Sequence, residues 1–368
     1  MPRSRNMARF LVPALLFLFL LPFLWSFFPT RSQAPQDHDP ARPANFGVGF
    51  DLAPTYGTAA VSYPNGTVRS IIKIDGDASY SEMMARLSLY SSQHLHRPYN
   101  YAEGVADLPR RLLRDMRMLL GLPASGDVYT LSKMIKKLHT AAELLIGQPV
   151  ASAEASIPDF ACALYGEDIH EAFNYLGLNF YQFRNWDSYD FMYSSNGAHA
   201  NYDPHVCSNF TEPDHCWKYT PNPGDPLAGV PWLLLVSYGY TYLESSAYLA
   251  VYPIVQTPAP FNSTLGYDAL QDALNEEEYW ERFRQYISSS MGPYLRNVTR
   301  LVLTGDAAHI PKFRHVLRDV TDSIWEHELE VFDSEPVFAA ARGGAILTMK
   351  EIWHRNHPGD DTNMVQEL

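Results

Sequence analysis

The sequence predicts an α/β protein, and three observations support this class. Segments in which apolar and polar residues alternate as in strands are interleaved with segments of helical periodicity. Near the C-terminal end, the run Leu301–Thr304 meets a small-residue turn, and apolar residues then recur at helical spacing behind Pro311. With 368 residues, of which 46% are hydrophobic, the chain can bury a substantial core in one large or two medium domains.

The N-terminal segment predicts a membrane anchor. Three arginines within the first ten residues precede the uncharged apolar run Leu11–Phe28, which is long enough to cross a bilayer as a helix. The run ends in bulky residues before Pro29, so we expect an uncleaved signal-anchor, with a cleaved signal peptide as the alternative. Because basic residues stay on the cytosolic side, the bulk of the chain is expected to be lumenal or extracellular, in the secretory pathway. The expected segments are a cytosolic tail at 1–10, a single transmembrane helix at 11–28 and a linker at 29–45.

Sequons and cysteines are consistent with an oxidising secretory compartment. Four Asn-X-Ser/Thr triplets predict N-glycosylation, at Asn65, Asn209, Asn262 and Asn297. Cys207 and Cys216 lie close together in a polar segment and are expected to form a loop disulfide. The third cysteine, Cys162, has apolar neighbours and is expected to be a buried thiol.

Charge argues against nucleic acid as a partner. The formal net charge is −13, and no cluster of Lys and Arg beyond the N-terminus resembles a phosphate-binding surface. His199, His205 and His215 lie near the paired cysteines and suggest a metal site as an alternative. Their spacings match no standard zinc pattern, so we expect no metal there.

The first half of the folded part combines a strand meander with helices. Phe46–Ile74 predicts three strands, with turns at Pro54 and at Asn65-Gly66. Residues 79–120 are expected to be largely helical, and 127–146 and 166–177 follow helical periodicity more clearly. Residues 151–160 predict a strand between the last two helices.

The second half repeats strands and helices after an irregular stretch. Residues 186–231 are aromatic and polar and predict no regular element. Residues 232–251 predict a strand pair, and 267–290 predict an amphipathic helix. The strand, turn and helix of 301–317 follow, and a run rich in Ala and Gly opens an apolar helix within 333–350. The final segment, 351–368, is expected to be a polar tail.

Four motifs in this order resemble those of a known family. Gly47–Tyr56 resembles the first phosphate hairpin, Gly-Ile-Asp-Leu-Gly-Thr-Thr-Tyr, of actin-like ATPases in the version used by the seventy-kilodalton heat-shock chaperones. Leu131–Phe160 is similar to the helix and strand that close the first lobe of that family. Gly305–Lys312 resembles its adenosine motif, Gly-Gly-Ser-Thr-Arg-Ile-Pro-Lys, and Asp333–Leu347 the segment entering its last helix.

The resemblance implies a two-lobed, ribonuclease-H-like ATPase fold without the peptide-binding domain of the chaperones. Lobe I would span 46–185 and lobe II 186–350. The second lobe is expected to be reduced. Only about fifteen residues separate its strand pair, 232–251, from the helix beginning at Tyr267, and the chaperones insert a whole subdomain between these two elements.

The resemblance also implies a site for ATP or ADP with Mg²⁺ between the lobes. Asp51 is the catalytic candidate, an acid that would reach the metal-bound water, with an ordinary strand-end acid as the alternative. The other implied nucleotide-binding positions come from the first phosphate hairpin, from a second hairpin at Val236–Thr241 and from the adenosine motif. They are Gly49, Thr55, Tyr56, Gly239, Thr241, Gly305, Asp306 and Ala307.

Departures from the family pattern argue against hydrolysis. The Gly-Thr of the first hairpin is Ala53-Pro54, and proline lacks an N–H that could hold phosphate. The second hairpin, Val236–Thr241, keeps one glycine and no aspartate, and Asp306 brings a negative charge to the adenosine motif. The family's lysine that assists phosphoryl transfer has no counterpart. Because this chemistry depends on positioning and charge neutralisation, we expect little or no ATPase activity.

Three functions therefore remain open. The first is a membrane-tethered glycoprotein with a degenerate nucleotide-binding domain that retains at most weak ATP or ADP binding. The second is a pseudo-ATPase that binds no nucleotide and acts as a scaffold or as the partner of a lumenal protein. The third is an unrelated lumenal enzyme, although neither a Gly-X-Ser-X-Gly elbow nor a His-Glu-X-X-His pair is present.

Overall fold

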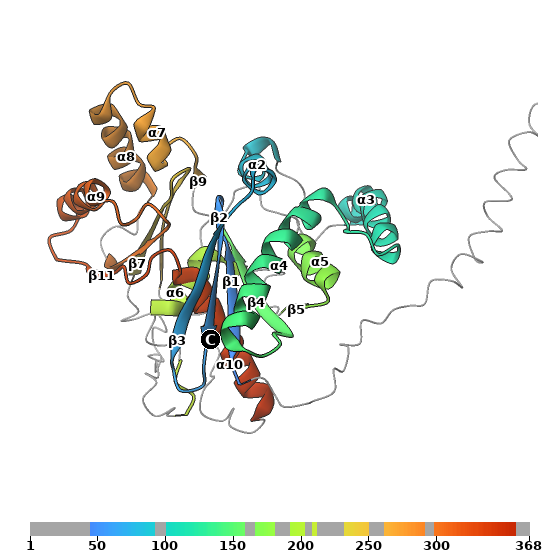
Figure 1. Cartoon of the computed structure of the whole chain (residues 1–368). Coiled ribbons are helices and arrows are strands. Elements are labelled where there is room, and N and C mark those ends of the chain that lie inside the picture. The colour runs from blue at the N-terminus through green and yellow to red at the C-terminus, as the bar shows by residue number, and fades with distance from the viewer. Residues whose placement is uncertain are drawn as a thin grey trace, which may run out of the picture. The chain divides into compact units, whose positions relative to one another are not determined.

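The computed structural model describes residues 45–92, 101–158, 166–180, 192–202, 208–211, 232–249, 261–290 and 298–357. These residues belong to one compact unit, Ala44–Leu368. Their fold is mixed α/β, with nine α-helices and two β-sheets among the described residues (Figure 1). The predicted α/β class is thereby confirmed.

The first sheet comes mainly from the N-terminal half of the unit. Its strands are β1 (Gly47–Leu52), β2 (Tyr56–Ser62), β3 (Val68–Asp75), β4 (Ser152–Ile157), β5 (Asn179–Phe180) and β6 (Met192–Tyr193). The meander predicted for the first three strands is confirmed, since β1, β2 and β3 pair antiparallel in sequence. β4 is parallel to β1 and β5 is parallel to β4, which gives the order β3-β2-β1-β4-β5, and β6 also pairs with β4.

The second sheet has the same topology. Its strands are β7 (Trp232–Tyr238), β8 (Leu243–Leu249), β9 (Phe261–Asn262), β10 (Val298–Thr304) and β11 (Glu330–Phe332). β7, β8 and β9 pair antiparallel, β10 is parallel to β7, and β11 is parallel to β10. Taken in chain order, the five strands therefore repeat both the spatial order and the directions of β1 to β5.

Helices from the first half cover one face of the first sheet. They are α2 (Ala78–Leu87), α4 (Gly126–Ile146) and α5 (Gly166–Leu176), with a 3-10 turn at Tyr90–Ser92. α3 (Tyr101–Leu119) lies outside α4 and α5 (Figure 1). The hydroxyl of Ser125 caps α4 by accepting the N–H of Val128, and Gly147 ends it in a left-handed conformation at φ 72°. The inner face of α4, with Leu131, Ile135 and Leu138, joins the core over the sheet.

A second set of helices covers one face of the second sheet. They are α7 (Tyr267–Gln271), α8 (Glu276–Ser290) and α9 (Pro311–Ile324). Tyr238 of β7 packs against Phe283 of α8 and stacks on Phe313 of α9, at a centroid distance of 4.3 Å for the latter pair. The single helix predicted at 267–290 is two helices, because the Asn275 side chain accepts the N–H of Glu277 and starts α8 anew.

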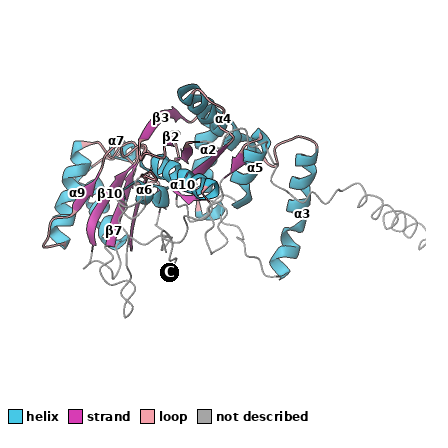
Figure 2. Ribbon diagram, turned by 90° about the horizontal axis from the view of Figure 1, so that it is seen from below, coloured by secondary structure: helices cyan, strands magenta, loops and turns pink. Residues whose placement is uncertain are grey.

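Two further helices, α6 (Ser194–Tyr202) and α10 (Ala339–Asn356), contact each other and the remaining sheet faces (Figure 2). α10 packs on β1, β2 and β4 of the first sheet. α6 contacts the second sheet, where Ala198 joins Leu233 and Leu235. The two helices cross so closely that a Cβ built on Gly343 would stand 1.7 Å from the carbonyl oxygen of Gly197. The run rich in Ala and Gly at the start of α10 is therefore required by backbone packing.

Two of these elements differ from the sequence-based expectation. α6 falls in the stretch predicted to be irregular, because it is buried on most sides and so carries no apolar periodicity. α10 continues to Asn356 and buries Ile352, so residues 351–356, expected to belong to the polar tail, are helical.

No helix in the described part of the chain is both long and apolar enough to cross a membrane. The predicted span 11–28, the cysteines Cys162, Cys207 and Cys216, and the sequon at Asn297 all lie outside the described residues. The same holds for the cytosolic tail, for nearly all of the linker, and for His205 and His215.

Candidate functional site

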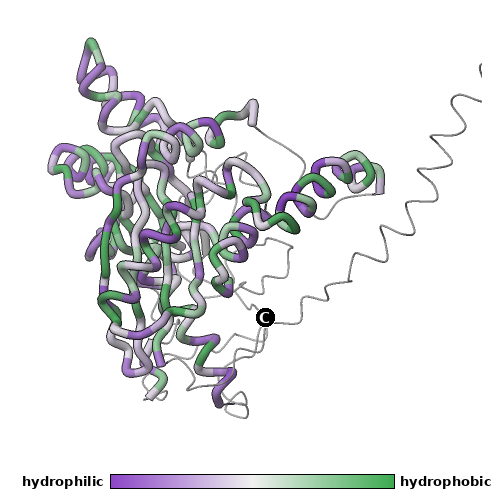
Figure 3. The backbone as a smooth tube through the Cα atoms, turned by 45° about the vertical axis from the view of Figure 1, so that its right-hand side comes forward, coloured by the Kyte–Doolittle hydropathy of each residue, from purple (hydrophilic) through white to green (hydrophobic). Residues whose placement is uncertain are grey.

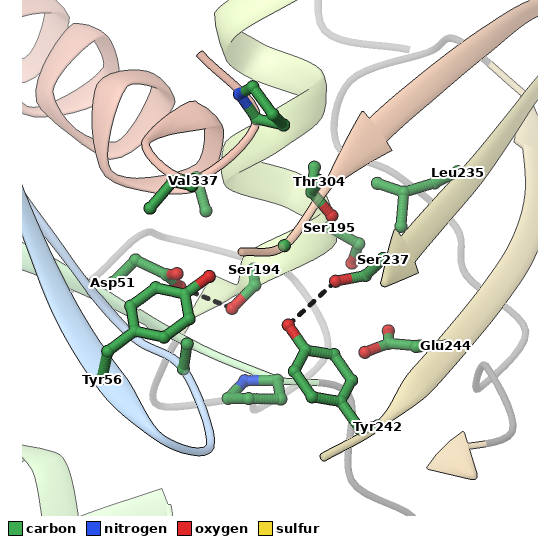
Figure 4. A pocket seen from close by; sticks show the side chains of 15 residues that line it. Asp51, Tyr56, Ser194, Ser195, Leu235, Ser237, Tyr242, Glu244, Thr304 and Val337 are labelled. Atoms are coloured by element: carbon green, nitrogen blue, oxygen red, sulfur yellow. Dashed lines mark hydrogen bonds between the residues drawn. The ribbon is translucent and has the colours of Figure 1, made fainter. Parts of the chain in front are cut away.

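A small cavity lies between the two sheets and receives side chains from both (Figure 4). The first sheet contributes the β1–β2 hairpin and the second contributes β7, β8 and the end of β10. Its lining residues are Asp51, Ala53, Tyr56, Pro158, Ser194, Ser195, Leu235, Ser237, Tyr242, Glu244, Thr304, Gly305, Pro336, Val337 and Ala340. The cavity volume of about 20 Å³ is room for about one water molecule.

Asp51 sits at the end of β1 and is buried. The hydroxyls of Ser156 and Ser194 both donate to its Oδ1 atom, at 2.8 and 2.6 Å. Burial raises the pKa of Asp51 from 3.8 to about 6, although the hydrogen bonds from Ser194 and Ser156 oppose that rise. The β1–β4 register places Asp51 beside Ser156, and the start of α6 supplies Ser194.

Two tyrosines fill the space in front of Asp51. Tyr56, from β2, and Tyr242, from the β7–β8 turn, point their hydroxyls into the same region from opposite sheets (Figure 4). Both rings are almost entirely buried. The Tyr242 hydroxyl also lies 3.0 Å from the Ser237 hydroxyl. Burial, and then the neighbouring Tyr242, raise the pKa of Tyr56 well above its ordinary value, so both phenols stay neutral.

Beside the cavity, an ion pair joins the two sheets. The Nζ atom of Lys73 on β3 lies 3.3 Å from Oδ2 of Asp306, in the turn after β10, and 4.6 Å from the centre of the Tyr56 ring. Asp306 is buried and also accepts the N–H of Tyr240. Burial alone would lower the pKa of Lys73, but the hydrogen bond to Asp75 and the charge of Asp306 raise it above its ordinary value.

The structure brings only some of the predicted nucleotide-binding residues to this cavity. Asp51, Tyr56 and Gly305 line it, and Asp306 follows directly after Gly305. Gly49 does not line the cavity, since a Cβ there would stand 2.2 Å from the carbonyl oxygen of Ala341 in α10.

The other predicted residues, and Gly305 as well, belong to turns. Gly305 has a left-handed φ of 95°, and Ala307, two residues later, donates its N–H to the carbonyl oxygen of Tyr238. Gly239 makes room for the ring of Tyr242, which would collide with any side chain there. Thr55 accepts the N–H of Gly76 through its carbonyl oxygen, and Thr241 is exposed.

Several residues of the site carry no signal in the sequence. Ser194 and Glu244 are ordinary polar residues that the fold brings to the cavity, and Ser156 is an ordinary serine that the fold buries against Asp51. Lys73 has a weak local signal, because it is a cation inside the otherwise apolar and polar alternation of β3. Its partner Asp306 lies in the other sheet and cannot be inferred from spacing.

The geometry favours packing over chemistry. The cavity has no space for a substrate, and the serine hydroxyls around Asp51 are used as hydrogen-bond donors to it. Among the residues that the structure describes, no group of three or more His, Cys, Asp and Glu side chains could hold a metal ion. His199, the described member of the three histidines, is buried in α6.

No protein-family model matches the chain, and no curated protein matches it.

Proposed function

We propose that this chain is an actin-like pseudo-ATPase, a two-lobed domain whose interlobe site is occupied by its own side chains and which acts as a scaffold for a protein partner. Lobe I is built on the first sheet and lobe II on the second. The observation that carries the proposal is the ion pair between Lys73 on β3 and Asp306 in the segment that resembles the adenosine motif, packed beside Tyr56 of the segment that resembles the first phosphate hairpin.

The repeated topology supports the actin-like part of this proposal. A two-lobed fold with a site between the lobes is what the family resemblance implies. Two sheets with the same strand order and directions, and a cavity lined from both, are consistent with that architecture. The reduced second lobe agrees with the short α7, a helix of five residues, between β9 and α8.

The filled cavity supports the pseudo-ATPase part. A nucleotide with Mg²⁺ would have to displace Tyr56 and Tyr242 and separate Lys73 from Asp306. Each step carries a cost, because the rings would lose buried contacts and Asp306 would lose its cationic partner. Pro54 and the single glycine of the second hairpin offer few backbone N–H groups to phosphate in return.

Exposed sequons support placement in the secretory pathway. In each of the three described sequons, the Asn side-chain oxygen accepts the backbone N–H of the threonine two residues later. At Asn209 and Asn262 it also accepts the threonine hydroxyl, at 2.7 and 2.8 Å. The three threonines are exposed, which is consistent with access by a glycosylating enzyme.

Weak nucleotide binding is the second candidate function. Its specific support is Asp51, which the fold holds at the end of β1, in the cavity between the sheets, as the family resemblance implies. This function requires an open form in which the lobes part and the Lys73–Asp306 pair is broken.

A thermal-shift titration of the fragment 45–368 with ATP, ADP and Mg²⁺ separates the two candidates. A ligand that binds only the native state raises the melting temperature once its concentration passes the dissociation constant. The scaffold proposal predicts no shift at millimolar nucleotide. A shift that is present in the parent fragment and absent after Asp51→Ala would favour nucleotide binding.

A further inference from the structure

Helix α3 is attached to the rest of the unit by its charged side. Arg110 pairs with Glu167 of α5 at 2.5 Å, and Arg114 pairs with Asp168 and Glu171 of the same helix. Arg114 and Asp168 are buried by this contact. The helix therefore turns Arg110 and Arg114 inward and leaves its opposite side outward, which reverses the usual arrangement of a surface helix.

The outward side of α3 is apolar along its whole length. Its residues recur at spacings of three and four and are all exposed: Tyr101, Val105, Leu108, Leu112, Met116 and Leu119. Leu108 is 45% exposed, Leu112 is 53% exposed and Leu119 is 61% exposed. We call this set of six residues the α3 apolar face. Monomeric soluble proteins rarely leave so continuous a stripe uncovered.

The position of α3 leaves this face open. In both Figure 1 and Figure 2, α3 lies outside α4 and α5, on the side away from the first sheet. Figure 3 shows purple and green residues alternating along α3, as expected of an amphipathic helix. With 19 residues the helix is about 28 Å long, so the face is several turns in extent.

We propose that the α3 apolar face lies in the interfacial layer of a lipid bilayer, with the helix axis in the membrane plane. An interfacial helix has an apolar face of large residues opposite a basic face, and α3 has this pattern. Arg110 and Arg114 of that opposite face are paired with carboxylates of α5, so the contact with lipid rests on the apolar face itself.

The length of chain before the fold favours lipid over a second copy as the occupant. This step rests on the membrane anchor proposed for Leu11–Phe28. The seventeen residues 29–45 reach at most about 60 Å when fully extended, so they would hold the folded unit close to the bilayer surface. Tethering of this kind raises the effective concentration of a weak second membrane contact.

Vesicle flotation of the fragment 45–368 tests the proposal without the anchor. This fragment corresponds to the compact unit, and the probe is vesicles of phosphatidylcholine and phosphatidylserine. We expect the fragment to float with the vesicles. The double substitution Leu108→Glu and Leu112→Glu is expected to lower the partition coefficient more than about tenfold, because two half-exposed leucines would no longer enter the apolar layer.

Leu145→Glu is the matched control, since Leu145 on α4 is 54% exposed, close to the 53% of Leu112. We expect this variant to float like the parent fragment, and all variants to keep the parent melting temperature because the changed positions are exposed. Failure of the parent to float, or equal flotation of the double variant, would overturn the proposal. A parent dimer in sedimentation velocity that becomes monomeric in the double variant would assign the face to a second copy and would also overturn it. None of these outcomes bears on nucleotide binding, which the thermal-shift titration tests separately.

Discussion

Lys73 on β3 and Asp306 in the turn after β10 form a salt bridge of 3.3 Å that links the two sheets beside the cavity. Asp306 stands where the resembled adenosine motif has its second glycine, so the substitution supplies a partner for a cation from the other lobe. The residue that departs from the resembled motif is thus part of the contact between the two sheets. In the proposed pseudo-ATPase, this pair, together with Tyr56 and Tyr242, takes the place of a nucleotide between the two sheets.

Removal of Lys73 should weaken the folded unit. Lys73→Ala leaves Asp306, which is 7% exposed, with the backbone N–H of Tyr240 but without its cation. We expect a loss of about 1–3 kcal/mol in the free energy of unfolding, measured with urea. Lys133→Ala is the control, because its pair with Asp77 is more exposed and should be worth less than about 1 kcal/mol. Equal effects of the two substitutions would contradict a special role for Lys73.

Asp51 should make the folded unit less stable as the pH rises. Its pKa is raised from 3.8 to about 6, so between these values the folded state binds more protons than the unfolded state. The neutral carboxyl therefore contributes about 3 kcal/mol to the free energy of unfolding below about pH 4, and this contribution is lost by about pH 6.

Asp51→Asn should remove that part of the pH dependence. The amide oxygen can still accept the hydroxyls of Ser156 and Ser194, and no charge is buried at neutral pH. We expect this variant to be more stable than the parent at pH 7, and to show a shallower loss of stability between pH 4 and 6 in urea titrations. Some slope should remain, because burial also raises the pKa of Glu154 well above its ordinary value. An unchanged slope would mean that Asp51 is not the buried neutral acid described above.

The crossing of α6 and α10 should not tolerate a side chain. In Gly343→Ala, the new methyl would stand 1.7 Å from the carbonyl oxygen of Gly197, so the helices must move apart. We expect a loss of about 1–3 kcal/mol or more, despite the better helix propensity of alanine. Gly126→Ala, where nothing lies within 4 Å of the added methyl, should be neutral or stabilising. The melting temperatures of the two variants test this prediction. A Gly343→Ala variant as stable as the parent would contradict the close crossing of α6 and α10.

Secretory expression of the full chain should yield N-glycosylated protein. At Asn262 the side-chain oxygen accepts both the N–H and the hydroxyl of Thr264, and Thr264 is exposed. Treatment with peptide N-glycosidase should therefore lower the mass, and Asn262→Gln should remove the mass of one glycan. A mass equal to that of the bare polypeptide would contradict the proposed lumenal location.

Local sequence patterns predicted much of the fold. The alternation in Phe46–Ile74, with Asn65-Gly66 at its second turn, predicted the β1–β3 meander, and the apolar face of 127–146 predicted α4. β3 and α4 expose one side more than the other, whereas β1 and β2 are buried throughout and are delimited by turns at Pro54 and Asn65-Gly66. The periodicity of the first two elements and the turns around the other two are therefore visible in the sequence alone.

The rest depends on contacts between distant segments. α6 has no apolar stripe because both sheet and helix cover it, and the sequence therefore predicted an irregular segment there. The Lys73–Asp306 pair and the serines around Asp51 arise only when separate strands and helices are brought together. The resemblance to actin-like ATPases implied a site between two lobes, which stays a prediction, and the packing of Tyr56 and Tyr242 at the cavity became apparent only in three dimensions.

Calorimetric titration of Mg²⁺-ATP into the fragment 45–368 tests the central claim most directly. If the lobes are held together by Lys73, Asp306 and the two tyrosines in place of a nucleotide, no binding heat is expected up to millimolar ATP, at either low or moderate salt. Saturable binding of one ATP per chain at micromolar concentrations, abolished by Asp51→Ala, would contradict the account and assign the cavity to a working nucleotide site.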